Sequence, residues 1–199
     1  MKNKGDLLVK ETVNLEECLI KNPVIAAIRN DEDLKKAINS KVRIVFILYG
    51  SIMNIKKICD RLKEADKLVF VHVDLIEGLK GDYTGLLFLK ETVQPYGIIS
   101  TKATNVKNAK KLGLSVIQRI FAVDSLSLET GIRNIQSVLP DAVEVMPGVA
   151  SKIIKIIGES VQVPIIAGGL IQSKMDIMES IESGAIAIST TERKLWELA

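Results

Sequence analysis

The sequence predicts a compact (β/α)8 TIM-type barrel, built as a single domain from residues 1–199. Apolar strand patterns and helical patterns alternate about eight times along the chain, and no hairpin turn interrupts them. Such alternation indicates a parallel sheet with right-handed crossovers. Eight repeats favour a closed barrel over an open sheet, and no glycine-rich dinucleotide fingerprint follows the first strand. With 199 residues, the barrel would be smaller than the usual one of about 250 residues.

The predicted strands are short apolar runs, as expected for parallel strands whose two faces are both buried. They cover residues 23–28, 42–48, 68–74, 97–102, 115–120, 142–146, 164–167 and 185–188. Pro23 separates the first of them from a preceding helix, and Gly50-Ser51 provides the turn after the second.

Helical spacing of apolar residues and capping side chains mark the segments between the strands. Asn14 can cap a first helix at residues 12–20, with Glu17 at capping-box spacing, and this helix could plug the barrel floor. Later caps are expected at Thr104 or Asn105, at Asp124 or Ser125, and at Ser173. The remaining predicted helices cover residues 32–39, 52–64, 84–93, 106–112, 125–139, 150–158 and 174–182.

Two turns near the end of the chain together predict an anion site. Gly168 and Gly169 follow the seventh strand, where glycine allows a sharp turn and a close approach to a ligand. Ser189, Thr190 and Thr191 follow the eighth strand and are expected to open another short helix, whose N–H groups favour an anion. Many (β/α)8 barrels bind phosphate at this place. The alternative is two ordinary turns, because turn chemistry alone explains glycine and serine there.

Charged residues are expected to converge at the same end of the barrel. Alternate residues of a barrel strand point inward, and counting along the strands gives three cations and two carboxylates near the carboxyl ends. These are Arg29, Asp74, Lys102, Arg119 and Glu144. Because buried charges are costly unless paired or used, they predict either a ligand with a phosphate and hydroxyl groups or an internal ion-pair network that neutralises itself.

The sequence contains no clear catalytic or metal-binding constellation. His72 is the single histidine, and its mid-strand position favours a hydrogen-bonded core residue over a catalytic base. No nucleophile–base pair and no cluster of metal ligands stands out. We therefore predict no catalytic residues, no metal and no cofactor. A barrel enzyme could still use Lys102 with Asp74 or Glu144 as acid or base.

Composition adds weaker constraints. Lys and Arg total 27 against 24 Asp and Glu, and this excess of +3 indicates nucleic-acid binding only if the charge gathers on one face. No apolar run is long enough to cross a membrane and the N-terminus is polar, so a cytoplasmic protein without a secretory signal is expected. Cys18 and Cys59 are expected to be reduced structural thiols.

Six ordered segments resemble the glycerol uptake operon antiterminator family. They are His72–Gly78, Gly97–Lys102, Gln118-Arg119 with Asp124-Ser125, Glu144–Gly148, Pro164–Gly169, and Ser189–Thr191 with Leu195-Trp196. The resemblance implies a non-enzymatic barrel that binds glycerol 3-phosphate as an effector. The liganded protein would bind leader mRNA of a glycerol-utilisation operon and prevent premature termination. The residues that we expect to bind the effector are Arg29, Asp74, Lys102, Arg119, Glu144, Gly148, Gly168, Gly169, Ser189 and Thr190.

The residues themselves leave other functions open. The chain has no recognisable RNA-binding module, its basic residues are scattered over predicted helices, and its aromatic content of 4% offers few stacking platforms. A homo-oligomer could gather the charge. The alternatives are a lyase or isomerase acting on a small phosphorylated polyol or sugar, and a metabolite-binding protein that regulates a protein partner.

Overall fold

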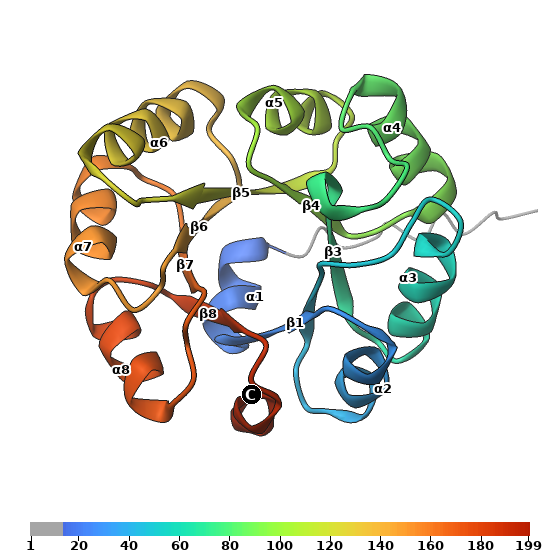
Figure 1. Cartoon of the computed structure of the whole chain (residues 1–199), viewed down its shortest axis with the longest axis horizontal. Helices are drawn as coiled ribbons and strands as arrows, with labels where there is room; N and C mark the ends of the chain where they lie inside the picture. The colour runs from blue at the N-terminus through green and yellow to red at the C-terminus, as the bar shows by residue number, and fades with distance from the viewer. Residues whose placement is uncertain (1–13) are drawn as a thin grey trace, which may run out of the picture.

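Eight parallel strands form a closed barrel in the computed structural model, which describes residues 14–199 (Figure 1). Each strand pairs with its neighbours in chain order, and β8 pairs with β1 to close the sheet. The predicted (β/α)8 architecture is therefore confirmed. The strands are β1 Val24–Ile28, β2 Ile44–Ile47, β3 Leu68–His72, β4 Gly97–Ser100, β5 Ser115–Phe121, β6 Ala142–Met146, β7 Ile165–Gly168 and β8 Ala187–Thr190.

One helix precedes the first strand, and the later helices follow the strands and surround them (Figure 1). The α-helices are α1 Leu15–Lys21, α2 Asp31–Asn39, α3 Ile55–Glu64, α4 Tyr83–Phe88, α5 Ala103–Lys111, α6 Ser125–Val138, α7 Ser151–Ser160 and α8 Lys174–Glu182. A π-helical turn, η2 Leu89–Val93, continues α4, while 3-10 helices occur at η1 Val73–Leu75 and η3 Arg193–Leu198.

The predicted helix caps are confirmed where the capping side chain bonds to a residue three positions away in the sequence. Ser173 and Asp176 form a capping box at the start of α8, and Asp124 and Ser127 form one at the start of α6. The prediction for α5 is wrong, because this helix begins three residues earlier than expected, at Ala103, without a side-chain cap. Its Asn105 instead contributes to a hydrogen-bond network described below.

The core has two layers. An outer cluster lies between the strands and the surrounding helices, and an inner cluster fills the barrel. Leu15, Cys18 and Leu19 of α1 belong to the inner cluster, so α1 plugs the barrel as predicted and appears in the middle of the ring of helices in Figure 1. The Asn14 side chain accepts a hydrogen bond from the Glu16 amide, so the expected capping box with Glu17 does not form.

The inner cluster confirms the predicted inward face of most strands but corrects β4. Ile25, Ile117 and Ala142 are all inside the barrel, whereas in β4 the inner residue is Ile99 and Ile98 packs in the outer layer. The expectation that Ile98, Ser100 and Lys102 share the inward face is therefore wrong. Both faces of β4 are buried, so hydrophobicity alone could not show which side faces the barrel interior.

Further predictions concern the cysteines, membrane-spanning helices, metal ligands and the N-terminus. Both cysteines are buried in helices and unpaired, and burial raises the pKa of the Cys59 thiol to about 12. Within residues 14–199, no helix has the length and apolarity needed to cross a membrane, and no group of three acidic, histidine or cysteine side chains is placed to hold a metal. Residues 1–13, on which the absence of a secretory signal was predicted, lie outside the described residues.

Candidate ligand-binding site

A pocket of about 550 Å³ opens at the carboxyl end of the barrel, where barrel ligands bind. Its volume lies in the range usual for small-molecule sites. Six of the ten predicted ligand residues line it: Arg29, Arg119, Glu144, Gly169, Ser189 and Thr190. The other lining residues are Thr191, which belongs to the hydroxyl turn of the predicted anion site, and seven that the sequence did not single out: Ala27, Leu48, Met146, Leu170, Ile171, Gln172 and Glu192.

A buried polar chain forms the inner wall of this pocket. The Arg119 Nε donates to Glu144 Oε2 at 2.6 Å, and the Ser189 hydroxyl donates to Glu144 Oε1 at 2.5 Å. The Arg119 and Glu144 side chains are only 8% and 1% exposed. The ion-pair alternative therefore holds for these two residues in the structure, and both carboxylate oxygens are engaged. Arg119 and Glu144 come from the paired strands β5 and β6, and Ser189 comes from β8, which β7 separates from β6. The closed barrel therefore fixes their relative positions.

The glycine turn after β7 has two distinct constraints. A Cβ on Gly168 would lie 2.6 Å from Glu144 Oε1 and 2.7 Å from the Ser189 hydroxyl, so glycine leaves room for their hydrogen bond. Gly169 has φ +77°, a left-handed conformation that favours glycine. Leu170 also has a positive φ, +62°, which is uncommon for a branched residue and directs an exposed side chain to the pocket rim.

The end of β8 differs in detail from the predicted helix start. Ser189 and Thr190 belong to the strand, and η3 begins after Glu192, whose side chain caps it. The prediction that the Ser189–Thr191 hydroxyls open this helix is wrong. The Thr190 hydroxyl instead donates to the Ile171 carbonyl at 2.7 Å, which ties β8 to the turn after β7. The buried Trp196 Nε1 donates to the Thr190 carbonyl at 3.0 Å and holds η3 against this end of the barrel.

Arg29 provides a cation on the opposite rim. It follows β1, lines the pocket and is exposed, and its side chain has no ion pair among the described residues. Its backbone N–H donates to Asp33 Oδ2 at 2.9 Å. Because Asp33 also pairs with Arg193 of η3, the backbone at the Arg29 position is anchored to both α2 and η3.

Asp74 lies outside the pocket lining, contrary to its predicted place beside the ligand. It is in η1 beyond β3, and its Oδ2 accepts from the Ser100 hydroxyl at 2.9 Å and the Thr101 amide at 2.8 Å. The Asn105 side chain donates to its Oδ1 at 3.2 Å. Asp74 therefore joins the ends of β3 and β4 to the first turn of α5, which is a structural contact.

Lys102 and Gly148 are also absent from the pocket lining. Lys102 is exposed at the N-cap position of α5, because the inward face of β4 is the one that carries Ile99. Gly148 packs against the turn after β7, and a Cβ there would lie 2.7 Å from the Gly168 amide nitrogen. Its role in the structure is to let the turns after β6 and β7 approach each other.

His72 is buried inside the barrel, as predicted, but its Nδ1 has no hydrogen-bond partner. The nearest carboxylate oxygen, Asp74 Oδ2, is 3.9 Å away. Burial lowers the pKa of His72 to about 4, and the positive charge of Arg119 acts in the same direction. The imidazole is therefore neutral at neutral pH.

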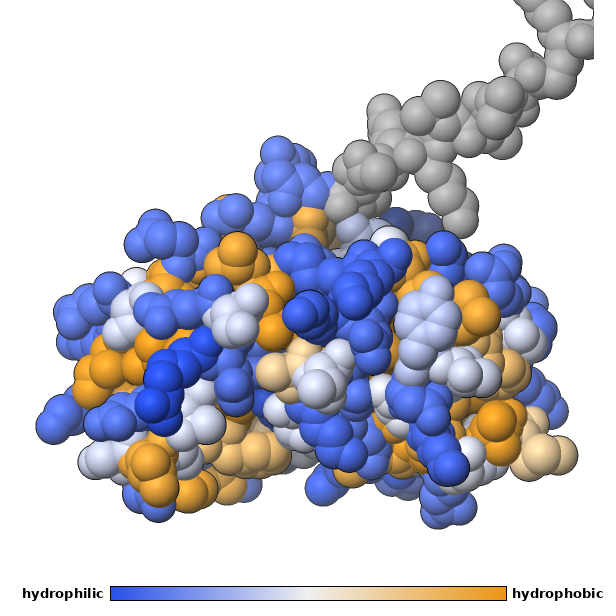
Figure 2. All heavy atoms as spheres, turned by 90° about the horizontal axis from the view of Figure 1, so that it is seen from above, coloured by the Kyte–Doolittle hydropathy of each residue, from blue (hydrophilic) through white to orange (hydrophobic). Residues whose placement is uncertain are grey.

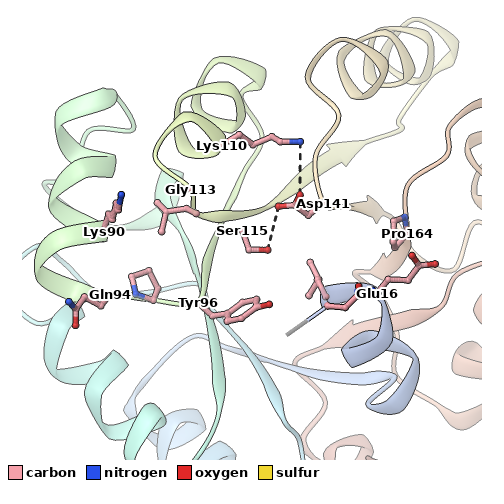
Figure 3. A pocket seen from close by; sticks show the side chains of 13 residues that line it. Glu16, Lys90, Gln94, Tyr96, Lys110, Gly113, Ser115, Asp141 and Pro164 are labelled. Atoms are coloured by element: carbon pink, nitrogen blue, oxygen red, sulfur yellow. Dashed lines mark hydrogen bonds and ion pairs between the residues drawn. The ribbon is translucent and has the colours of Figure 1, made fainter. Parts of the chain in front are cut away.

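A larger cavity of about 860 Å³ lies at the opposite end of the barrel, where α1 enters (Figure 3). Its polar groups include Lys110 and Asp141, whose charged atoms are 4.0 Å apart, and the Ser115 hydroxyl, which donates to Asp141 at 3.4 Å. None of the ten predicted ligand residues lines it. The convergence of buried polar groups therefore selects the smaller pocket at the carboxyl end.

Comparisons with known proteins agree with this architecture. The sequence profile of the glycerol-3-phosphate responsive antiterminator family matches residues 24–196. The glycerol uptake operon antiterminator regulatory protein of Listeria monocytogenes has a TM-score of 0.85 at 33% identity, covering 87% of this chain and 94% of that one. A glycerol uptake operon antiterminator-related protein of Thermotoga maritima has a TM-score of 0.79 at 34% identity, covering 88% and 98%.

A sequence relative and more distant structures complete the comparison. The uncharacterized protein YgcP of Escherichia coli is 39% identical over 181 residues, which cover 91% of this chain and 95% of that protein. Aldolases of the same fold match at only 10% to 14% identity, so they show a shared fold alone. The profile match over nearly the whole chain, with these relatives, places the protein in the glycerol-3-phosphate responsive antiterminator family.

Proposed function

We propose that the protein binds glycerol 3-phosphate in the pocket at the carboxyl end of the barrel. The liganded form would then bind leader mRNA of glycerol-utilisation genes and prevent premature termination. The ligand proposal rests on a single observation. One pocket contains both a cation whose side chain has no ion pair among the described residues and a buried carboxylate that is hydrogen-bonded to a hydroxyl. Arg29 suits a phosphate, and Glu144 with Ser189 suits hydroxyl groups.

The phosphate would lie between Arg29 and the turns that contain Gly169 and Thr191, where backbone N–H groups can approach an anion. The glycerol hydroxyls would face Glu144, whose carboxylate forms an ion pair with Arg119. Arg119 would orient the carboxylate and contribute positive charge. Glycerol would keep the contacts of its hydroxyl groups but lose those of the phosphate. The pocket would therefore distinguish glycerol 3-phosphate from glycerol by the charge of the phosphate.

The composition of the pocket supports an effector rather than a substrate. The alternative lyase or isomerase reading relied on Lys102, but no lysine occurs among the described residues that line the pocket. A Schiff-base route would therefore lack its nucleophile there. We propose that the protein acts without catalysis or a cofactor. Mass spectrometry after incubation with glycerol 3-phosphate should find the ligand unchanged, and catalytic conversion would refute this part of the proposal.

RNA binding would rely on phosphate contacts gathered over a limited surface. The net charge is only +3, and the face in Figure 2 is largely hydrophilic with separate hydrophobic patches. Exposed lysines on α2, α3 and α5 include Lys35, Lys56 and Lys107. The action that we propose on leader mRNA would take place in the cytoplasm.

A mobility shift with a glycerol-gene leader RNA tests the regulatory proposal. We expect retarded RNA with glycerol 3-phosphate, weaker retardation without it, and a decrease in affinity as the salt concentration rises. Glycerol at the same concentration serves as the control ligand. Equal retardation with and without glycerol 3-phosphate would remove the effector role, and no retardation in either condition would remove the RNA-binding role.

A further inference from the structure

The positive charge of the protein is concentrated on one side of the barrel. Residues 14–123, which include β1 to β5 and α1 to α5, contain 18 Lys and Arg against 12 Asp and Glu. Residues 124–199, which include α6 to α8 and the last three strands, contain six against ten. The net charge of +3 is therefore the balance of a basic part and an acidic part. A polyanion such as RNA would be attracted to the first and repelled by the second.

Helix α5 differs from the other helices in its charge. Every other α-helix among residues 14–199 that carries Lys or Arg also carries Asp or Glu. Helix α5 has no carboxylate, and no acidic residue occurs anywhere in residues 92–123. The helix and its N-cap position together carry four exposed lysines: Lys102, Lys107, Lys110 and Lys111.

Several cations elsewhere on the basic part are already paired. On α3, the Asp60 carboxylate lies 2.6 Å from the Lys56 amino group and 3.0 Å from that of Lys63. Arg43, which precedes β2, forms an ion pair with Asp66. The first turn of α2 consists of three acidic residues. These opposite charges weaken the attraction of α2 and α3 for an anionic partner, whereas nothing on α5 does so.

The solvent side of α5 combines lysines with neutral polar groups. Four residues recur there at helical spacing and define what we call the α5 face: Thr104, Lys107, Asn108 and Lys111. Within residues 14–199, Lys107 and Lys111 form neither an ion pair nor a side-chain hydrogen bond, whereas Lys110 donates to the Leu139 carbonyl. Helix α5 lies between α4 and α6 on the outside of the barrel (Figure 1), and the side seen in Figure 2 is hydrophilic in its middle.

Helix α5 begins beside the wall of the effector pocket. Asn105 in its first turn donates to Asp74 Oδ1 at 3.2 Å, and Thr101, just before the helix, lines a small pocket together with Arg119. Arg119 also lines the effector pocket and forms the ion pair with Glu144. A ligand that moves Arg119 would therefore act next to the residues that hold the start of α5.

We propose that the α5 face, together with Lys102, binds the phosphate backbone of the RNA. This inference rests on the proposed RNA-binding function and assigns its contact surface. The lysines would contact phosphates, and Thr104 and Asn108 would add hydrogen bonds to the backbone, so this surface would position the RNA without reading its bases. An anionic membrane is a poorer partner, because α5 carries no large exposed apolar side chain that could enter a lipid surface.

The test is the double variant Lys107→Gln with Lys111→Gln in the full chain. Leader RNA binding is measured at saturating glycerol 3-phosphate over 50–200 mM salt. The loss of two phosphate contacts should weaken binding by roughly 10-fold near 150 mM salt. It should also lower the slope of log affinity against log salt by about 0.7 for each contact to a single strand. The matched control is Lys152→Gln with Lys155→Gln on α7, which removes two exposed lysines from the acidic part and should change affinity by less than twofold.

Two further measurements separate a binding defect from other effects. Lys111 lies in the last turn of α5, where a cation stabilises the helix end, so the melting temperature should fall by no more than about 4 °C. Glycerol 3-phosphate affinity without RNA should match that of the wild type, because neither lysine lines the effector pocket.

Each remaining outcome decides against the α5 face. If the α5 variant and the α7 variant lose RNA affinity equally, the effect is one of net charge, so the α5 face is refuted while RNA binding itself stands. If the wild type binds no leader RNA, the proposed function and the α5 face both fall. If phosphatidylserine vesicles bind the wild type but not the α5 variant, and RNA binding is unaffected, the surface belongs to a membrane and the RNA assignment is overturned.

Discussion

The ion pair between Arg119 and Glu144 should contribute a large coupling energy to stability. The perturbation is a double-mutant cycle with Arg119→Met, Glu144→Gln and the combined variant. Arg119→Met keeps much of the side-chain length and leaves the Glu144 carboxylate without its cation. Glu144→Gln leaves the guanidinium without its anion, although an amide can still accept a hydrogen bond from Ser189.

The expected magnitude follows from the geometry. The charged atoms are 2.6 Å apart, and the two side chains are 8% and 1% exposed. Removing one partner of a buried pair costs about 3–5 kcal/mol, because the remaining charge is uncompensated. Both single variants should therefore lose about 3 kcal/mol or more of unfolding free energy. The combined variant leaves neither charge, so its loss should be smaller than the sum, with a coupling energy of about 3 kcal/mol.

Urea unfolding at pH 7.5 without ligand measures this cycle. The matched control is the pair of Lys56 and Asp60 on α3, whose charged atoms are also 2.6 Å apart but whose side chains are 55% and 35% exposed. Lys56→Met with Asp60→Asn should give a coupling of only about 0.3–0.5 kcal/mol. Additive losses at Arg119 and Glu144, or equal coupling in the two cycles, would refute the argument that burial makes this pair strong.

Three further predictions follow from the placement of single residues. Lys102→Met should change glycerol 3-phosphate affinity by less than about threefold in calorimetry, because the side chain is exposed outside the pocket; a 10-fold loss would show that Lys102 reaches the ligand. Gly168→Ala should weaken that affinity by about 10-fold or more, since its Cβ would lie 2.6 Å from Glu144 Oε1. Gly158→Ala, whose Cβ makes only a 3.5 Å contact, should bind normally, and equal affinities would make the Gly168 turn irrelevant to binding. His72 has a native pKa of about 4, below the ordinary 6.5, so protonation favours the unfolded chain: unfolding free energy should fall by about 2 kcal/mol from pH 7.5 to pH 5. His72→Gln should remove that part of the pH dependence, and an unchanged profile would contradict the assignment.

The barrel was predictable because its strands carry their own signal. Parallel strands buried on both faces are apolar runs, and capping residues such as Ser173 act through contacts within three residues. Arg119 and Glu144 were found because charged side chains near the carboxyl ends of strands stand out in the alternation of inward-facing residues. Ser189 was found through the hydroxyl residues that end the eighth strand, although the helix expected to start there begins later.

The remaining features depend on contacts between distant residues. The place of Lys102 could not be derived, because the two faces of β4 are equally buried and apolar. The hydrogen bonds of Asp74 reach residues 26 to 31 positions away, and no local pattern encodes them. The positive φ of Leu170 and the unpaired amide of Gln118 arise from tertiary packing, so only the structure reveals them.

Reciprocal coupling between glycerol 3-phosphate and leader RNA tests the central claim most directly. Calorimetric titration would measure glycerol 3-phosphate affinity with and without saturating leader RNA, and RNA affinity with and without saturating glycerol 3-phosphate. Because coupling between two ligands is reciprocal, both affinities should rise by the same factor, about 5-fold or more. A glycerol 3-phosphate affinity that the RNA leaves unchanged would contradict an effector-controlled RNA-binding protein.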